Sequence, residues 1–219
     1  MIHPPPPMFG FGIEFAYTII IFIFCFIIYF KTKEIYNLTN HKGIQLFRTA
    51  FLLFGLSYVA RFLTHMLMLT GRAFDIFMPF RGFFPFVLFI VTYLSTLAIL
   101  YLIYGKLWKN IRKEHFLIFS NTLALSLSLL ALMHRSQIII IIFQTILLIF
   151  GIILIVYHQD PHKKFTQTNL LYMLLLVFWL LNLFVLEPRG FPFEIKITFY
   201  ALSVLIFVII YHKVHKWIK

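Results

Sequence analysis

Four residues in one apolar stretch of the chain, Ser57, Tyr58, Arg61 and His65, have side chains that could do chemistry. Ser57, Arg61 and His65 recur every four residues, and this spacing places them on one face of a helix. An arginine inside an apolar span costs about 2.5–3.5 kcal/mol on insertion scales, so it usually faces the interior of a helix bundle and has a partner. His65 adds a group that can titrate near neutral pH. The pattern predicts either a charged staple between helices or a site for a small ligand, an ion or a proton.

The partner expected for Arg61 is Glu14, near the start of the preceding apolar stretch. Consecutive spans run antiparallel, and an arginine side chain can extend several ångströms from its helix. The other candidate carboxylates, Asp75, Glu187 and Glu194, lie in or beside segments that connect apolar stretches. Two further candidates, Asn182 and Trp179, come from aligning the second apolar stretch of the chain with the sixth. The predicted ligand-binding set is Arg61, His65, Tyr58, Ser57, Asn182, Trp179 and Glu14.

Membrane-spanning helices must position these residues. Of the 219 residues, 62% are hydrophobic and only 12% are charged, with a mean hydropathy of +0.94, whereas globular domains have about 25% charged residues. A helix of about 20 apolar residues crosses the hydrocarbon layer and satisfies its own backbone hydrogen bonds. We therefore predict an all-α polytopic membrane protein, with one domain over residues 1–219. Its seven transmembrane helices are expected at residues 11–30, 49–69, 83–104, 116–133, 138–157, 168–186 and 197–211, the last being the shortest.

Two polar patterns inside these spans predict helix contacts. Ser120, Ala124 and Ser128 form a row of small residues that suits close approach of a neighbouring helix. Asn121 and Gln144 can donate and accept hydrogen bonds between helices. For these residues packing is the favoured interpretation, and the lining of a solute pathway is the alternative.

The distribution of basic residues predicts the orientation. Counted by connecting segment, 13 lysines and arginines fall on one side of the membrane and 5 on the other, and basic residues are retained on the cytoplasmic side. The N-terminus is therefore expected outside and the C-terminus in the cytoplasm, in the cell membrane of a microbial cell. The net charge of +12 fits these topology signals and contact with anionic lipid head groups at the cytoplasmic face, so no nucleic-acid partner is expected.

Two connections carry enough apolar residues to have a structure of their own. Residues 31–48 mix basic and apolar side chains. Simple anchoring at the inner membrane surface is the favoured interpretation, and an amphipathic helix along that surface, formed by part of the segment, is the alternative. Residues 70–82 are too apolar to extend into water, so they are expected either to fold over the outer mouth as a lid or to rest at the interface.

An internal similarity suggests a repeat. The sequence RGFFPF at residues 81–86 precedes the third span, and RGFPF at residues 189–193 precedes the seventh. The predicted arrangement is a parallel 3+1+3 repeat with units at residues 9–104 and 138–215, joined by the helix at 116–133. Chance similarity in a chain with 29 phenylalanines is the alternative.

The second and sixth spans align without a gap when His41 is placed over His162. This alignment brings the two spans into register over their polar positions. The resulting pairs are Arg61 with Asn182 and Tyr58 with Trp179.

Seven helices, an outside N-terminus, an inside C-terminus and a 3+1+3 repeat resemble the broad group of small transporters, opsins and seven-helix receptors. The resemblance covers the whole chain and is one of architecture. The motifs of particular members are absent: the span at 197–211 has no lysine for a retinal Schiff base, Lys196 lies at its edge, and neither a Pro-Gln pair nor the Asp-Arg-Tyr and Asn-Pro-x-x-Tyr motifs occur. The first two spans, through residues 41–62, also resemble the membrane sensor regions of microbial signalling proteins.

Three functions remain open from the sequence. The first is a receptor-like or sensor-like protein that binds a small anionic or apolar molecule in an outward-facing cavity and acts on a separate signalling partner. The second is a small solute or ion transporter or channel with a midplane site between the repeats. The third is a structural subunit of a membrane complex, and the chain is also compatible with a homo-oligomer.

An enzyme is not expected, because the sequence offers no paired carboxylates and no nucleophile with a base at a suitable depth. The single cysteine, Cys25, lies in an apolar run and the histidine spacing does not predict a zinc site. No cofactor or metal is therefore expected, and a haem held by His65 and His134 is the alternative.

Overall fold

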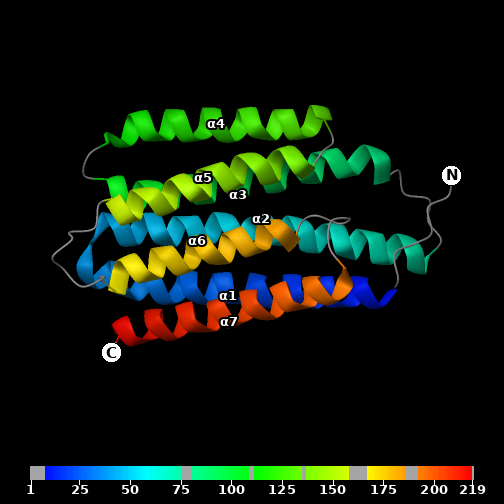
Figure 1. The fold of residues 1–219 in the computed structure, drawn as a ribbon, viewed down its shortest axis with the longest axis horizontal. Helices are drawn as coiled ribbons and strands as arrows, with labels where there is room; N and C mark the ends of the chain where they lie inside the picture. Colours follow the sequence, from blue (N-terminus) through cyan, green and yellow to red (C-terminus); the bar gives the residue numbers. More distant parts are fainter. Residues whose placement is uncertain are drawn as a thin grey trace.

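The structure is a computed structural model that describes residues 8–74, 80–108, 111–134, 137–157, 167–185 and 192–218. All regular secondary structure in these ranges is helical, as predicted. The helices are α1 (Met8–Thr39), α2 (Lys42–Ala73), α3 (Phe80–Leu107), α4 (Lys113–His134), α5 (Gln137–Tyr157), α6 (Gln167–Val185) and α7 (Phe193–Ile218). They run along the long axis of the molecule in alternating directions, so the two chain termini lie at opposite ends (Figure 1).

Six of the seven helices are long and apolar enough to cross a membrane. α6 is the shortest, with 19 residues. The prediction that the seventh helix is the shortest was wrong, because α7 has 26 residues and its polar last turns, with His215 and Lys216, remain helical beyond the apolar run. The chain is a multi-pass helical membrane protein.

The side chains are distributed as lipid requires. Large apolar residues on α5, among them Ile142, Ile146 and Ile153, are more than half exposed. In contrast, Ser120 and Ser128 of α4 are fully buried. Apolar side chains outside and hydrogen-bonded polar groups inside are expected where the surrounding solvent is hydrocarbon.

Polar side chains join neighbouring helices. The Gln144 amide of α5 donates to the hydroxyls of Ser95 (2.7 Å) and Thr96 (3.1 Å) of α3. The Tyr93 hydroxyl of α3 donates to Asn121 of α4 over 2.7 Å. The predicted interhelical hydrogen bonds are therefore confirmed, as is burial of the small-residue row on α4, whose middle member is Ala124.

α1 and α2 form a long helical hairpin. The turn is made by Asn40, which has a φ of 48° and whose N–H donates to the Tyr36 carbonyl over 2.8 Å. His41 then caps α2 by accepting from the Gly43 N–H at 3.2 Å. The interpretation of residues 31–48 as an amphipathic surface helix was wrong, because those residues form the last turns of α1 and the first turns of α2.

The lid predicted at residues 70–82 falls partly within helices, since α2 continues to Ala73 and α3 begins at Phe80. Residues 75–79 lie outside the described residues, so the lid stays a prediction there. Gly55 and Gly151 lie within unbroken helices and pack closely against neighbouring side chains.

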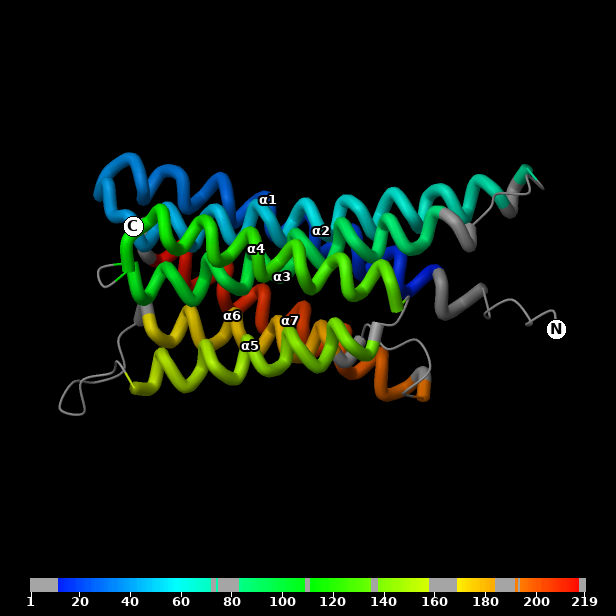
Figure 2. Tube along the Cα trace, turned by 90° about the horizontal axis from the view of Figure 1, so that it is seen from above, coloured from blue at the N-terminus to red at the C-terminus, as the bar shows by residue number. Residues whose placement is uncertain are grey.

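Six helices form a ring in which the backbone of each lies beside those of two others, with α1 beside α7 and α3 beside α5. α4 contacts α3 and α5 and lies at one edge in Figure 1, so that Figure 2, seen from above, draws it over the middle of the bundle. Aromatic side chains fill the space between α2, α6 and α7: Phe54 lies 3.8 Å from Trp179 and Phe178 lies 4.3 Å from Phe207, measured between ring centroids. This aromatic layer supports the floor of the candidate site.

Candidate functional site

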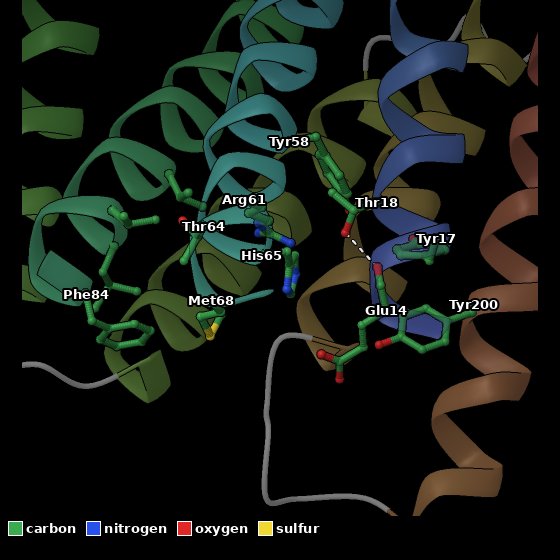
Figure 3. A pocket seen from close by; sticks show the side chains of 13 residues that line it. Glu14, Tyr17, Thr18, Tyr58, Arg61, Thr64, His65, Met68, Phe84 and Tyr200 are labelled. Atoms are coloured by element: carbon green, nitrogen blue, oxygen red, sulfur yellow. Dashed lines mark hydrogen bonds between the residues drawn. The ribbon is translucent and has the colours of Figure 1, made fainter. Parts of the chain in front are cut away.

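A cavity of about 330 Å³ opens among α1, α2, α3 and α7, within the size range of small-molecule sites. It lies toward the end of the bundle at which α1 begins. Its polar side chains come mainly from α1 and α2, and its apolar wall comes from α3 (Figure 3). The lining residues are Glu14, Tyr17 and Thr18 from α1; Tyr58, Arg61, Thr64, His65 and Met68 from α2; Phe84, Val87, Leu88 and Val91 from α3; and Tyr200 from α7.

Arg61 lies on α2, 12 residues before that helix ends at Ala73, which is about 18 Å along the axis. Its guanidinium lies 4.9 Å from the centre of the Tyr58 ring, within the range of a cation–π contact. Its Nε is buried and has no hydrogen-bond partner in the part of the chain that the structure describes. The Arg61 charge is thus held against the cavity by an aromatic ring, and among the described residues no carboxylate pairs with it.

Glu14 faces a different neighbour from the one predicted. The Tyr200 hydroxyl lies beside its carboxylate, on the side away from Arg61 (Figure 3). The positive charge that acts on Glu14 is that of Lys196 of α7, a side chain that is only 8% exposed. The expected Glu14–Arg61 ion pair is not formed, because α1 presents Glu14 toward α7.

His65 follows Arg61 by one helical turn and lines the same cavity, as the spacing predicts. Figure 3 places its ring below the Arg61 guanidinium, with Met68 farther along the same face of α2. The two nitrogen-bearing side chains therefore face one space together.

The floor of the cavity is a buried hydrogen-bonded group. The hydroxyls of Tyr17 and Tyr58 both donate to Oδ1 of Asn182, and Nδ2 of Asn182 donates to the Phe178 carbonyl over 2.8 Å. The Tyr17 ring also contacts Tyr200, with 4.4 Å between centroids. α1, α2 and α6 are thereby joined at one point, next to Arg61 on the side away from His65.

The seven predicted site residues thus fall into two groups. Glu14, Tyr58, Arg61 and His65 line the cavity. The other three are in the layer beneath it: Asn182 in the hydrogen-bonded floor, Trp179 in the aromatic layer, and Ser57, whose hydroxyl donates to the Phe54 carbonyl of its own helix over 2.7 Å.

Sequence reasoning missed several lining residues. Tyr17 and Thr18 follow Glu14 by three and four positions, so helical spacing alone places them on the Glu14 face. Lys196 and Tyr200 are likewise four residues apart on α7. No spacing signal identifies the apolar wall of α3, since its lining residues have no polar side chain that marks them in the sequence.

The cavity combines one guanidinium, one imidazole and one carboxylate with tyrosine hydroxyls and an apolar wall. This chemistry suits binding of a small charged molecule through ionic and hydrogen bonds. In the described ranges, histidine, cysteine and acidic side chains nowhere gather as a group of three or more that could hold a metal ion.

Comparison with known proteins gives one relative over the full length of the chain. An uncharacterised protein from Archaeoglobus fulgidus is 34% identical over 220 aligned positions, which cover 98% of this chain and 96% of the relative. No protein-family model matches the sequence, and no solved structure matches it.

Proposed function

This chain belongs to the same protein family as the Archaeoglobus fulgidus relative, and we propose that it is a receptor-like or sensor-like membrane protein whose cavity binds a small anionic molecule. The observation that carries the proposal is Arg61, a cation inside a membrane span that lines a cavity and pairs with no described carboxylate. An intramembrane charge is costly without a partner, so a bound anion would supply the negative charge that the described residues do not.

The surroundings of Arg61 support an anionic ligand. Lys196 provides a positive charge for Glu14, which leaves Arg61 as the cation facing the cavity from α2. The α3 wall can hold the apolar part of a small organic anion, and the Arg61 guanidinium can bind its charged end. A carboxylate of a few carbon atoms has both features.

The closed floor favours binding over an open pore. Asn182 joins two tyrosine hydroxyls immediately beneath the cavity, and the aromatic layer below it is tightly packed. A ligand that enters from one end therefore meets a dry barrier, so a receptor-like role needs a conformational signal read by a separate partner protein.

The proposed orientation places the cavity mouth outside the cell. The excess of basic residues lies at the end of the bundle where α1 finishes and α2 begins, and basic residues are retained in the cytoplasm. The opposite end, nearest Met68 and Phe84 of the cavity lining, then faces outward, with the protein in a microbial cell membrane.

Thermal unfolding of the purified full-length chain with simple anions tests the proposal. The probes are sodium acetate, propionate, butyrate, nitrate and phosphate at constant ionic strength. At least one should raise the Tm of the wild type, because a ligand that binds only the folded state stabilises it by mass action. The Arg61→Gln variant should lose that shift.

Arg48→Gln is the matched control. Arg48 is also on α2, but near its other end, where it donates to the Tyr29 hydroxyl over 2.9 Å. This variant should keep the anion-induced shift in Tm. The proposal is overturned if no anion stabilises the wild type or if Arg61→Gln responds as the wild type does.

A second candidate, a small anion transporter, gains support from the order of helix neighbours. Exchanging α1, α2 and α3 with α5, α6 and α7 leaves the neighbour pairs within the ring unchanged. This is the relation expected of a parallel repeat with α4 as a linker, and it places the Tyr58–Asn182 contact between the two units.

Uptake into proteoliposomes distinguishes the two candidates. The radiolabelled form of whichever anion stabilises the protein should stay outside the vesicles if the chain is receptor-like. Uptake by the wild type, lost in Arg61→Gln, would instead assign transport.

A further inference from the structure

A second cavity, of about 450 Å³, lies at the opposite end of the bundle from the Arg61 cavity. It is formed by the start of α2, the end of α3, the connection between α3 and α4, and the start of α4. None of its lining residues belongs to the Arg61 cavity, so it is a separate feature of the fold.

The mouth of this cavity is positively charged. Lys42, Arg112 and Lys113 all line it, and its lining contains no carboxylate. Lys42 and Lys113 are also the first residues of α2 and α4. Helix N-termini carry a partial positive charge, so cations placed there repel the helix dipole, and an anion between them relieves both repulsions.

The inner part of the cavity is aromatic and held in place. Tyr104 donates to the Ile111 carbonyl over 3.2 Å and stacks on Phe116 with 3.9 Å between ring centroids. Trp108 lies 5.8 Å from Nζ of Lys42 and 5.7 Å from the centre of the His41 ring. The pocket therefore has an amphipathic wall of the kind found where lipid head groups meet acyl chains.

We propose that this cavity binds a phosphate-bearing anion, with Lys42, Arg112 and Lys113 on the phosphate and Trp108 beside the apolar part. The volume holds more than a single phosphate, and the site is at the end of helices that cross a bilayer. Basic pockets between helices at this depth take anionic head groups. The phosphate can come from an anionic phospholipid or from a soluble phosphate, and the two sources are separable by experiment.

Native mass spectrometry of the full-length chain in detergent measures binding of an anionic phospholipid. The probe is phosphatidylglycerol, with phosphatidylcholine as the zwitterionic reference. The Lys42→Gln, Arg112→Gln, Lys113→Gln variant should bind phosphatidylglycerol on the order of tenfold or more weakly than the wild type, since each basic residue contributes separately to head-group attraction. Inorganic phosphate and pyrophosphate, added to lipid-depleted protein in a thermal shift assay, measure the soluble source.

The matched control removes the same charge at the same end of the bundle. Lys33, Lys213 and Lys216 lie on α1 and α7 and do not line the cavity. Their triple substitution by glutamine should leave phosphatidylglycerol binding within about threefold of the wild type, because it changes only the general surface charge.

The fluorescence of Trp108 provides a measurement of lipid binding that does not depend on the charge variants. Phosphatidylglycerol with brominated acyl chains should quench wild-type fluorescence in a saturable manner, and Trp108→Phe should lose that component. Selective loss of lipid binding in the cavity variant supports a lipid source, and selective loss of phosphate stabilisation supports a soluble one. Quenching that does not depend on Trp108 would exclude the lipid source. The proposal as a whole is overturned if both triple variants lose binding equally or if the cavity variant keeps both ligands.

Discussion

Asn182 lies where α1, α2 and α6 meet, and both the oxygen and the nitrogen of its side chain are hydrogen-bonded. Its oxygen accepts from Tyr17 and Tyr58, and its nitrogen donates to the Phe178 carbonyl. The residue is 3% exposed, so its hydrogen bonds are shielded from bulk water. A buried polar group in this position stabilises the fold only while all its bonds are satisfied.

Replacing Asn182 with leucine should therefore destabilise the protein. Two buried hydroxyls lose their acceptor, and each unpaired group costs about 1–3 kcal/mol in proteins generally, although interhelical bonds in membrane proteins average nearer 0.6 kcal/mol. We expect a loss of about 1–3 kcal/mol in the free energy of unfolding, measured by denaturant titration in mixed micelles.

Asn121→Leu is the control for that loss. Asn121 also accepts from a tyrosine hydroxyl, that of Tyr93, but it is exposed and binds only one. Its replacement should cost less than half as much. Equal losses for the two variants would show that the double acceptor role of Asn182 adds nothing.

The site could be predicted from the sequence only in part. Helical spacing places Arg61, His65 and Tyr58 together because residues on one helix share a face whatever the neighbours are. The partner of Glu14 depends instead on the rotation of α1 about its axis, which the packing against α7 decides. Spacing within one helix carries no information on that rotation, and so Lys196 was not identified.

At the scale of elements, apolarity located the membrane spans but not the ends of the helices. α1 continues nine residues beyond the predicted end at Phe30, through Lys31 and Lys33, because lysine is a good helix former and charge alone does not stop a helix. The stop comes from Asn40, whose positive φ breaks the helical path. The sequence feature that corresponds to this hairpin is Asn40 followed by His41, whose side chain caps α2.

Close contact between α3, α2 and α6 depends on a glycine at position 105. A Cβ atom there would lie 2.7 Å from the Tyr172 hydroxyl oxygen, which also donates to the Gly43 carbonyl over 3.3 Å. Gly105→Ala gains about 1 kcal/mol of helix propensity, but overpacking costs about 1–3 kcal/mol. We expect a net loss of up to about 2 kcal/mol in the free energy of unfolding.

The loss of unfolding free energy caused by Gly105→Ala should disappear or become a gain when the Tyr172 hydroxyl is removed. In a Tyr172→Phe background the clash at position 105 disappears, so Gly105→Ala should be neutral or stabilising in the same unfolding assay. Gly12→Ala is the reference, because a Cβ at Gly12 has no neighbouring atom within 4 Å. A loss that persists in the Tyr172→Phe background would contradict the proposed cause.

At the scale of the whole molecule, the two cavities lie at opposite ends of one bundle, with the Asn182 floor and the aromatic layer on the path from the first cavity. The first holds a charge within the membrane span, and the second gathers cations at helix ends. This polarity follows from the alternating directions of the helices, since alternate connections lie at the same end of the bundle and those at one end carry most of the basic residues (Figure 1).

The orientation of that polarity in the cell can be tested with single cysteines. Cys25 is fully buried, so the natural chain should be a blank for a membrane-impermeant maleimide. His134→Cys places a thiol at the exposed end of α4, on the side where α1 begins, and Leu38→Cys places one near the end of α1, where the natural side chain is 83% exposed. Because basic residues stay in the cytoplasm, the cysteine at position 134 should react in intact cells and the one at position 38 only after permeabilisation. Both should react in detergent, which controls for local accessibility. The reverse pattern would invert the topology, so that the Arg61 cavity would take its ligand from the cytoplasm and the basic cavity would face the outer leaflet.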